Sequence, residues 1–217
     1  MKKPVLLCSL VLLAACAREA PAPVGADPAP AASPAVDVDP PVADADAAAP
    51  AMGPPSFDCA KAASAAEKQI CGDAELAALD RTLATRYAAL PAPDPAVQRG
   101  WAKGRDECWK ADDARTCVLE AYKTRLVELA MQVPDAAVPK IVKYRCSDNA
   151  KPFTMTYYHD IDPQAAVMAW GNDEAIVFPQ PAASGAKYGR AGVEYWEHQG
   201  EASVDFFGNK LSCRPLA

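Results

Sequence analysis

The sequence is poor in the residues and motifs that several common protein classes require. Its 217 residues include only two histidines, His159 and His198, which excludes a multi-histidine metal site. No glycine-rich phosphate loop or dinucleotide fingerprint is present. Lys and Arg number 22 against 28 Asp and Glu, a net charge of −6, whereas a nucleic-acid binder needs a basic face. We therefore expect no metal, no cofactor and no nucleic-acid partner.

Long uninterrupted patterns are also missing. Aromatic residues make up only 7% of the chain, and 21 prolines break up any extended periodicity. One large compact domain is therefore not expected. The composition instead predicts four regions, at residues 1–15, 16–55, 56–135 and 140–217.

The first region is typical of an export signal. Lys2 and Lys3 precede an apolar run from Val5 to Ala15, a charged n-region followed by a short h-region. The run is too short to cross a membrane, because a span needs roughly 20 residues.

The end of this run resembles the bacterial lipobox. In Leu13-Ala14-Ala15-Cys16, small residues precede a cysteine, so we expect Cys16 to be acylated, with palmitate among its acyl groups, and to become the mature N-terminus. By resemblance to the Gram-negative sorting rule, Ala17 after this cysteine favours the outer membrane. The prediction is an envelope lipoprotein that faces the periplasm and is anchored in the membrane through Cys16.

The second region, residues 16–55, is a predicted linker. Residues 17–55 contain 14 Ala and 10 Pro. Frequent prolines remove backbone donors, so an extended, disordered tether is expected in place of the helix that alanine favours.

The third region, residues 56–135, shows helical periodicity. Apolar residues recur at steps of three and four, and the segment PAPDP after Leu90 interrupts them. Asp73 and Glu75 suit a helix N-terminus. A bundle of about four helices is predicted. So small a core needs covalent support, and Cys59–Cys71 and Cys108–Cys117 are the local disulfides that we favour.

This region resembles the LprI N-terminal domain, whose family is named after a lysozyme-inhibiting lipoprotein. The resemblance rests on FDCAKAASAAEKQIC (57–71), WAKGRDEC (101–108) and the residues Leu76, Leu79, Asp80, Tyr87, Cys117, Tyr122 and Arg125. It implies no defined contact residue. Arg105 and Asp106 are expected to form a solvated or capping ion pair, with a recognition pair as the alternative.

From residue 140 to the end the period changes to two. Four strand-length runs are rich in β-branched and aromatic residues: PFTMTYYHD, EAIVFP, GVEYWE and ASVDFFG, separated by GND, SGAKYGRAG, HQG and GNK. Such a pattern predicts an antiparallel sheet that closes into a small barrel. Cys146 and Cys213, in the first and last strands, would then lie together. Their disulfide closes a 68-residue loop, which stabilises the fold by about 4 kcal/mol.

The strand order and motifs of this region resemble the MliC family, membrane-bound inhibitors of C-type lysozyme. The resemblance covers roughly Tyr144 to Cys213, and its most specific part is Ser184-Gly185-Ala186-Lys187-Tyr188, which matches the family's Ser-Gly-x-x-Tyr motif. Gly200-Glu201-Ala202 also fits. The resemblance implies that C-type lysozyme is the partner.

The resemblance also implies a mechanism. C-type lysozyme uses two carboxyl groups in a cleft, one protonated and one ionised. The Ser184 hydroxyl can both donate and accept, so it can lie between them. Gly185 would permit the required turn, and Tyr188 would brace the loop from the barrel side or stack in the cleft.

One motif departs from the family. A Trp-x-Lys-Gly motif supplies a lysine to the ionised carboxylate in the family, whereas Trp196-Glu197-His198-Gln199-Gly200 has none. Losing a charge-assisted bond weakens binding by around tenfold. Lys187 or a protonated His198 is expected to substitute.

Other functions fit the sequence less well. Ser184 with His159 or His198 lacks a nucleophile elbow, so the chain is not expected to be an enzyme. A turn, not a metal site, is predicted for His159-Asp160-Ile161-Asp162, because this segment has only one histidine. SGAKY could also be only a tight turn.

The sequence thus predicts an α+β chain of two domains, a disulfide-bonded helical bundle and an antiparallel β-barrel after a disordered Ala/Pro linker. The predicted function is inhibition of C-type lysozyme, which protects peptidoglycan, through Ser184, Gly185, Lys187, Tyr188, His198 and Gln199. The alternative is a structural or sensing lipoprotein that binds another periplasmic or cell-wall component. The helical region would bind lysozyme, bind peptidoglycan or position the barrel, and no oligomeric state is favoured.

Overall fold

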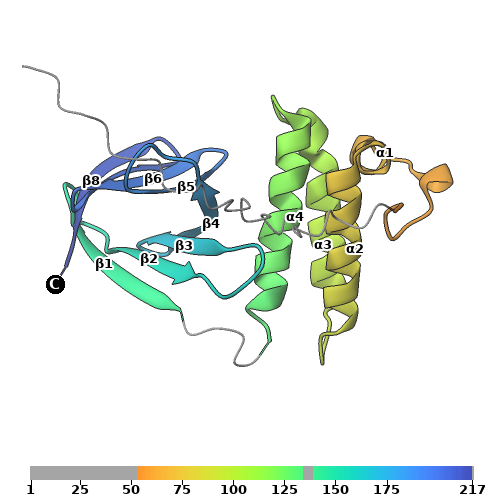
Figure 1. Ribbon diagram of the computed structural model, residues 1–217, viewed down its shortest axis with the longest axis horizontal. Coiled ribbons are helices and arrows are strands. Elements are labelled where there is room, and N and C mark those ends of the chain that lie inside the picture. Colours follow the sequence, from red (N-terminus) through yellow and green to blue (C-terminus); the bar gives the residue numbers. More distant parts are fainter. Residues whose placement is uncertain (1–52, 134–138, 217) are drawn as a thin grey trace, which may run out of the picture. The chain divides into compact units, whose positions relative to one another are not determined.

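The computed structural model describes residues 53–133 and 139–216. The predicted signal peptide, Cys16 and the linker up to residue 52 lie outside these ranges. All described helices and strands belong to one unit of the chain, Asp46–Ala217. Four α-helices precede eight β-strands (Figure 1), so the predicted fold class is confirmed. No helix in the described part of the chain is both long and apolar enough to span a membrane.

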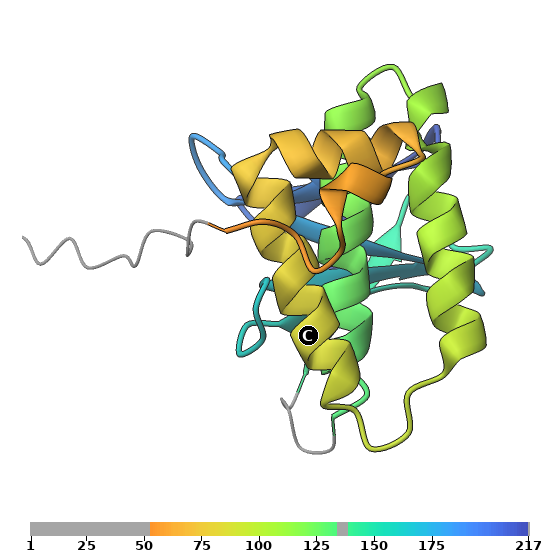
Figure 2. The ribbon, with the colours of Figure 1, turned by 90° about the vertical axis from the view of Figure 1, so that its right-hand side faces the viewer.

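The helical part contains four α-helices and two short 3-10 helices. Helices α2, α3 and α4 run roughly side by side, and α1 crosses near one end (Figure 2). The elements are η1 (Cys59–Lys61), α1 (Ala65–Gly72), α2 (Ala74–Ala88), α3 (Pro95–Asp106), η2 (Glu107–Lys110) and α4 (Ala114–Ala130).

Each α-helix begins at a polar side chain that accepts from free backbone N–H groups. Ser64 and Glu67 form a capping box at α1, and Asp73 accepts from Glu75 and Leu76 at the start of α2. Asp94 caps α3, whose first residue is Pro95, and Asp113 caps α4. The PAPDP segment therefore ends one helix and starts the next.

A buried polar network ties the helices together. The Tyr122 hydroxyl donates to Asp80 Oδ1 at 2.8 Å and accepts from Arg105 Nη1 at 3.0 Å. Burial raises the pKa of Tyr122, which keeps this hydroxyl protonated. Arg105 is only 7% exposed and also pairs with Asp106 at 2.7 Å. The expectation of a solvated or capping pair is wrong, because this guanidinium lies inside the bundle.

Residues just before the first helical element contact helix α2. Pro55 is buried, and the Ser56 N–H donates to Asp80 Oδ2 at 2.6 Å. Arg81 donates to the Pro54 carbonyl at 2.9 Å. Composition assigned these prolines to the linker, but Pro55 is buried and the Pro54 carbonyl accepts a hydrogen bond from α2.

Two disulfides brace the helical core. Cys59 is bonded to Cys71, and Cys108 to Cys117. The apolar core of the helical part contains Ile70, Leu76, Leu83, Val118, Tyr122, Leu126 and Leu129. These residues include most of the periodic positions of the sequence.

The eight strands form a closed antiparallel barrel in which each strand pairs with its neighbours in sequence and β1 pairs with β8. They are β1 (Lys140–Cys146), β2 (Phe153–Tyr158), β3 (Ala165–Trp170), β4 (Asp173–Gln180), β5 (Ala186–Arg190), β6 (Val193–His198), β7 (Glu201–Phe206) and β8 (Asn209–Pro215). Cys146 lies opposite Cys213 and is bonded to it.

Four of the eight strands, β1, β3, β5 and β8, do not appear among the four strand-length runs of the sequence, although Cys146 and Cys213 were placed in a first and a last strand. Residues 165–170 form β3, because small and apolar side chains fill the narrow barrel interior there. Residues 186–190, predicted as part of a separating loop, form β5. Tyr188 packs into the core while Lys187 faces outward, and this alternation was too short to recognise in the sequence.

We predict that Tyr122→Phe lowers the free energy of unfolding by about 1 to 3 kcal/mol, because Asp80 and Arg105 would lose a buried partner. Urea unfolding followed by circular dichroism measures the change. Tyr87→Phe, at a partly buried tyrosine of the same core, is the matched control and should change stability by less than about 0.5 kcal/mol. Equal effects of the two substitutions would contradict this role of the network.

Candidate functional site

The connection between β4 and β5 carries Ser184, and two side chains of β6 hold it. Ser184 Oγ lies 3.1 Å from His198 Nδ1. The Trp196 indole N–H donates to the Ser184 carbonyl at 3.1 Å. Ser184 is exposed. Its hydroxyl is therefore presented to solvent from a loop that is fixed at both the side chain and the backbone.

Gly185 determines how closely this loop approaches β6. Its φ is +74°, in the left-handed region, and a Cβ there would lie 1.9 Å from the Glu197 carbonyl oxygen. No residue with a side chain fits without a backbone shift. Because residue 185 is a glycine, the Ser184 loop can lie directly against β6.

Lys187 and Tyr188 occupy opposite faces of β5. Tyr188 is 9% exposed, and its ring packs edge-on against Tyr157 and Tyr195 at 5.4 and 6.4 Å. Burial raises the pKa of Tyr188. Tyr188 was expected either to brace the loop from the barrel side or to stack in the lysozyme cleft. In the structure it lies on the barrel side. The Lys187 ammonium pairs with Glu194 at 2.8 Å, so it is directed along the barrel wall.

His198 and Gln199 lead into the β6–β7 hairpin. Gln199 has φ +54° and Gly200 has φ +79°, so the two residues form a tight turn, and Glu197 Oε1 accepts from the Gly200 N–H at 3.0 Å. The strands follow one another around the barrel in antiparallel order, so the β4–β5 and β6–β7 connections lie at the same end.

The structure thus brings Ser184, Gly185, His198 and Gln199 together. Trp196, which is 40% exposed, is a further member that sequence reasoning did not assign. Its position could have been read from β6 itself, where Val193 and Tyr195 point inward and the intervening residues outward. The site offers a hydroxyl, an imidazole and an indole. Within residues 53–133 and 139–216 no group of acidic, His and Cys side chains could hold a metal ion.

Comparison with known proteins shows to which family the chain belongs. It is 44% identical over 164 residues to lipoprotein LprI of Mycobacterium bovis and to lipoprotein LprI of two strains of Mycobacterium tuberculosis. Each alignment covers 73% of this chain and 83% of the relative. The chain belongs to the LprI lipoprotein family.

The carboxy-terminal part of this LprI-family chain also matches a domain family. The family model described as membrane-bound lysozyme-inhibitor of C-type lysozyme matches residues 144–212, which include the Ser184 connection. Both resemblances predicted from the sequence are therefore confirmed. A solved structure, Pseudomonas aeruginosa MliC in complex with hen egg white lysozyme, is 28% identical, with coverage of 36% of this chain and 83% of that chain and a TM-score of 0.31.

We predict that Gly185→Ala destabilises the barrel more than Gly200→Ala. Both sites have positive φ, which costs alanine about 1 kcal/mol. Nothing lies within 4 Å of a Cβ at Gly200, whereas at Gly185 the Glu197 carbonyl must move. We expect Gly185→Ala to cost at least about twice as much in the free energy of unfolding, measured by urea titration. Equal losses would mean that the loop does not lie against β6.

Proposed function

We propose that the protein is a lipid-anchored envelope inhibitor of C-type lysozyme that protects peptidoglycan. Two comparisons support this proposal. The family whose model matches residues 144–212 is one of inhibitors, not enzymes, and the curated relatives are named lipoproteins. The lipobox at Cys16 supplies the anchor, and Ala17 favours the outer membrane, with the folded part facing the periplasm.

The observation that carries the proposed mechanism is the exposed and doubly held Ser184. In the lysozyme cleft a protonated and an ionised carboxyl group lie near each other. A hydroxyl between them accepts a hydrogen bond from the first and donates one to the second. Because β6 holds the Ser184 loop by Trp196 and His198, little conformational entropy is lost when the loop enters the cleft.

His198 determines which hydrogen bonds the Ser184 hydroxyl can make with the two carboxyl groups. If Nδ1 carries the proton, it donates to Ser184 Oγ and leaves the hydroxyl hydrogen for a carboxylate. If Nδ1 is bare, it accepts that hydrogen, and the lone pairs of Oγ remain for the protonated carboxyl. Lys187 is engaged with Glu194 on the barrel wall. His198 is therefore the proposed substitute for the family's lysine.

Ser184→Trp tests the insertion of the loop. Lysis of a cell-wall suspension by hen lysozyme is measured with increasing amounts of the protein. The wild type should inhibit, and the variant should need a concentration roughly 30-fold higher or more, because a bulky indole cannot enter between the two carboxyl groups. Ser147→Trp, in the β1–β2 connection at the other end of the barrel, should inhibit like the wild type.

Two outcomes would contradict the proposal. If folded, disulfide-bonded wild-type protein leaves lysis unchanged at micromolar excess, the protein is not a C-type inhibitor, and the structural or sensing role becomes the better proposal. If Ser184→Trp and Ser147→Trp inhibit equally, inhibition does not use the Ser184 loop.

Gln199→Lys tests the missing lysine by restoring it. The substitution places an ammonium group directly before Gly200. The backbone at residue 199 has positive φ, and its strain is similar for glutamine and lysine. We expect inhibition to strengthen by around tenfold, since a charge-assisted bond replaces a neutral one. Gln199→Met is the uncharged control of similar length and should bring no gain. A lysine variant no better than the methionine variant would contradict the role assigned to charge at this position.

A further inference from the structure

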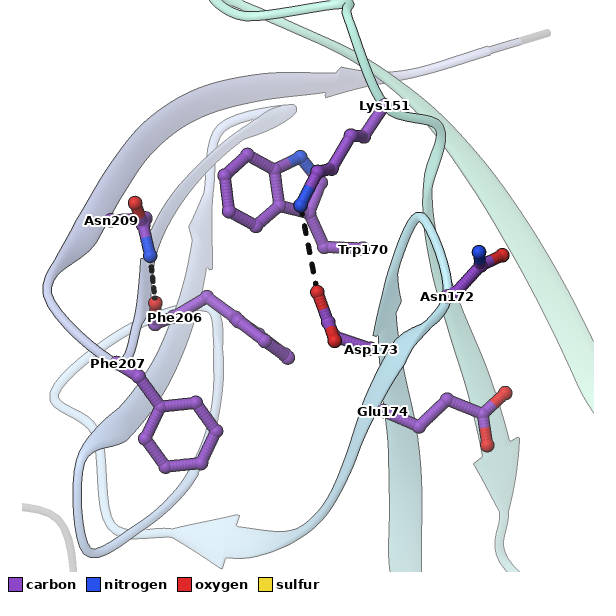
Figure 3. Close-up of a pocket in the computed structure, with 8 residues that line it drawn as sticks. All are labelled: Lys151, Trp170, Asn172, Asp173, Glu174, Phe206, Phe207 and Asn209. Carbon is purple, nitrogen blue, oxygen red and sulfur yellow. Dashed lines mark hydrogen bonds and ion pairs between the residues drawn. The ribbon is translucent and has the colours of Figure 1, made fainter.

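A second candidate site lies at the end of the barrel opposite Ser184. The β1–β2, β3–β4 and β7–β8 connections meet there, because connections alternate between the two ends of an antiparallel barrel. They enclose a cavity of about 530 Å³, within the range of small-molecule sites. Figure 3 shows the aromatic and polar side chains that line it, among them Lys151, Trp170, Asn172, Asp173, Phe207 and Asn209.

Trp170 contributes an unused hydrogen-bond donor. The residue is 8% exposed, and its indole Nε1 has no hydrogen-bond partner among the described residues. Buried N–H groups are almost always paired, and the indoles of Trp101 and Trp196 both donate to backbone carbonyls. An unpaired indole N–H beside a cavity is explained if a bound molecule supplies the acceptor.

Lys151 covers this indole and can move. Its ammonium lies 4.5 Å from the centre of the Trp170 ring and 3.5 Å from Asp173 (Figure 3). The Lys151 and Asp173 side chains are 48% and 65% exposed, so the pair holds weakly. With Glu174, the lining carries two carboxylates against one ammonium, which disfavours an anionic ligand.

Phe207 is the second unusual feature of this end. It is 55% exposed and has φ +49°, a conformation that a bulky residue adopts only at a cost. It stands at the first position of the tight β7–β8 turn before Gly208, where asparagine is preferred. Neither the barrel core nor the turn needs an aromatic ring there.

The Phe207 ring is nevertheless held in place. It packs edge-on against Phe206 at 5.2 Å, and a Cβ on Gly192 would lie 3.0 Å from it. The ring also borders a second hollow of about 430 Å³, lined on the far side by Gly192, Glu194 and Asp205. One fixed, exposed ring thus separates two polar hollows along the rim.

We propose that this rim, formed by Trp170, Asn172, Asp173, Phe207 and Asn209, binds a linear glycan of N-acetylated amino sugars, the polysaccharide of the bacterial wall. A sugar ring presents a flat face of C–H groups that stacks on Phe207, and its neighbours along the chain occupy the two hollows. The amides of Asn172 and Asn209, the Asp173 carboxylate and the Trp170 N–H match hydroxyl and acetamido groups. The barrel would then hold the wall at one end and lysozyme at the other.

Phe207→Asn tests the proposal without disturbing the fold, since Asn-Gly is the preferred sequence for this turn. The probe is the hexamer of β-1,4-linked N-acetylglucosamine, titrated calorimetrically into the full-length protein in detergent, with no lysozyme present. We expect the wild type to bind and the variant to bind at least about tenfold more weakly, because the stacking surface is lost. Trp170→Phe, which keeps a ring but removes the N–H, should weaken binding about fivefold.

Ser184→Trp separates this proposal from the proposed function. It should leave glycan binding unchanged, and Phe207→Asn should leave lysozyme inhibition unchanged. Absence of hexamer binding at millimolar concentration, or equal binding by wild type and Phe207→Asn, would overturn the glycan site whatever the lysozyme assay gives. Tighter binding of the de-N-acetylated, cationic hexamer than of the acetylated one would also overturn it, because an acidic surface would then be the receptor.

Discussion

Closure of the barrel is the constraint on which the sites depend. The first and last strands pair directly, and the Cys146–Cys213 disulfide joins them across that pairing. A closed sheet has no free edge for another chain to extend, so recognition is confined to connections and outward side chains. Antiparallel order then sorts the connections into two sets. Ser184 and Gln199 fall at one end, and Asn172 and Phe207 at the other.

At both ends the chain keeps a costly turn. Gln199 and Phe207 are the non-glycine residues with positive φ in the described part of the chain. Each is the first residue of a two-residue loop that joins the strands of a β-hairpin. Asparagine would fit either place with less strain. Strained backbone conformations cluster at sites that bind other molecules. The two proposals, one at each end, use these two residues.

Much of the fold followed from the sequence, whereas the site followed only in part. Periodicity and the capping residue Asp73 located the helices, and the disulfides join the cysteines that spacing and strand order favoured. The strand 186–190 was missed, because its alternation is short and lies inside a glycine-rich stretch. Trp196 and the pairing of Lys187 with Glu194 depend on the register between β5 and β6, which no local pattern encodes. The buried Arg105 was mistaken for a surface charge, since its partner Tyr122 is 17 residues away.

The crystal structure of the complex with a C-type lysozyme tests the proposed inhibition most directly. The measurement is the distance from Ser184 Oγ to the two catalytic carboxyl groups of the lysozyme. Insertion of the loop predicts hydrogen-bond distances of about 2.5 to 3.0 Å to at least one of them, with His198 facing the cleft. A lysozyme bound elsewhere on the chain, with the Ser184 loop in solvent and the cleft open, would contradict it.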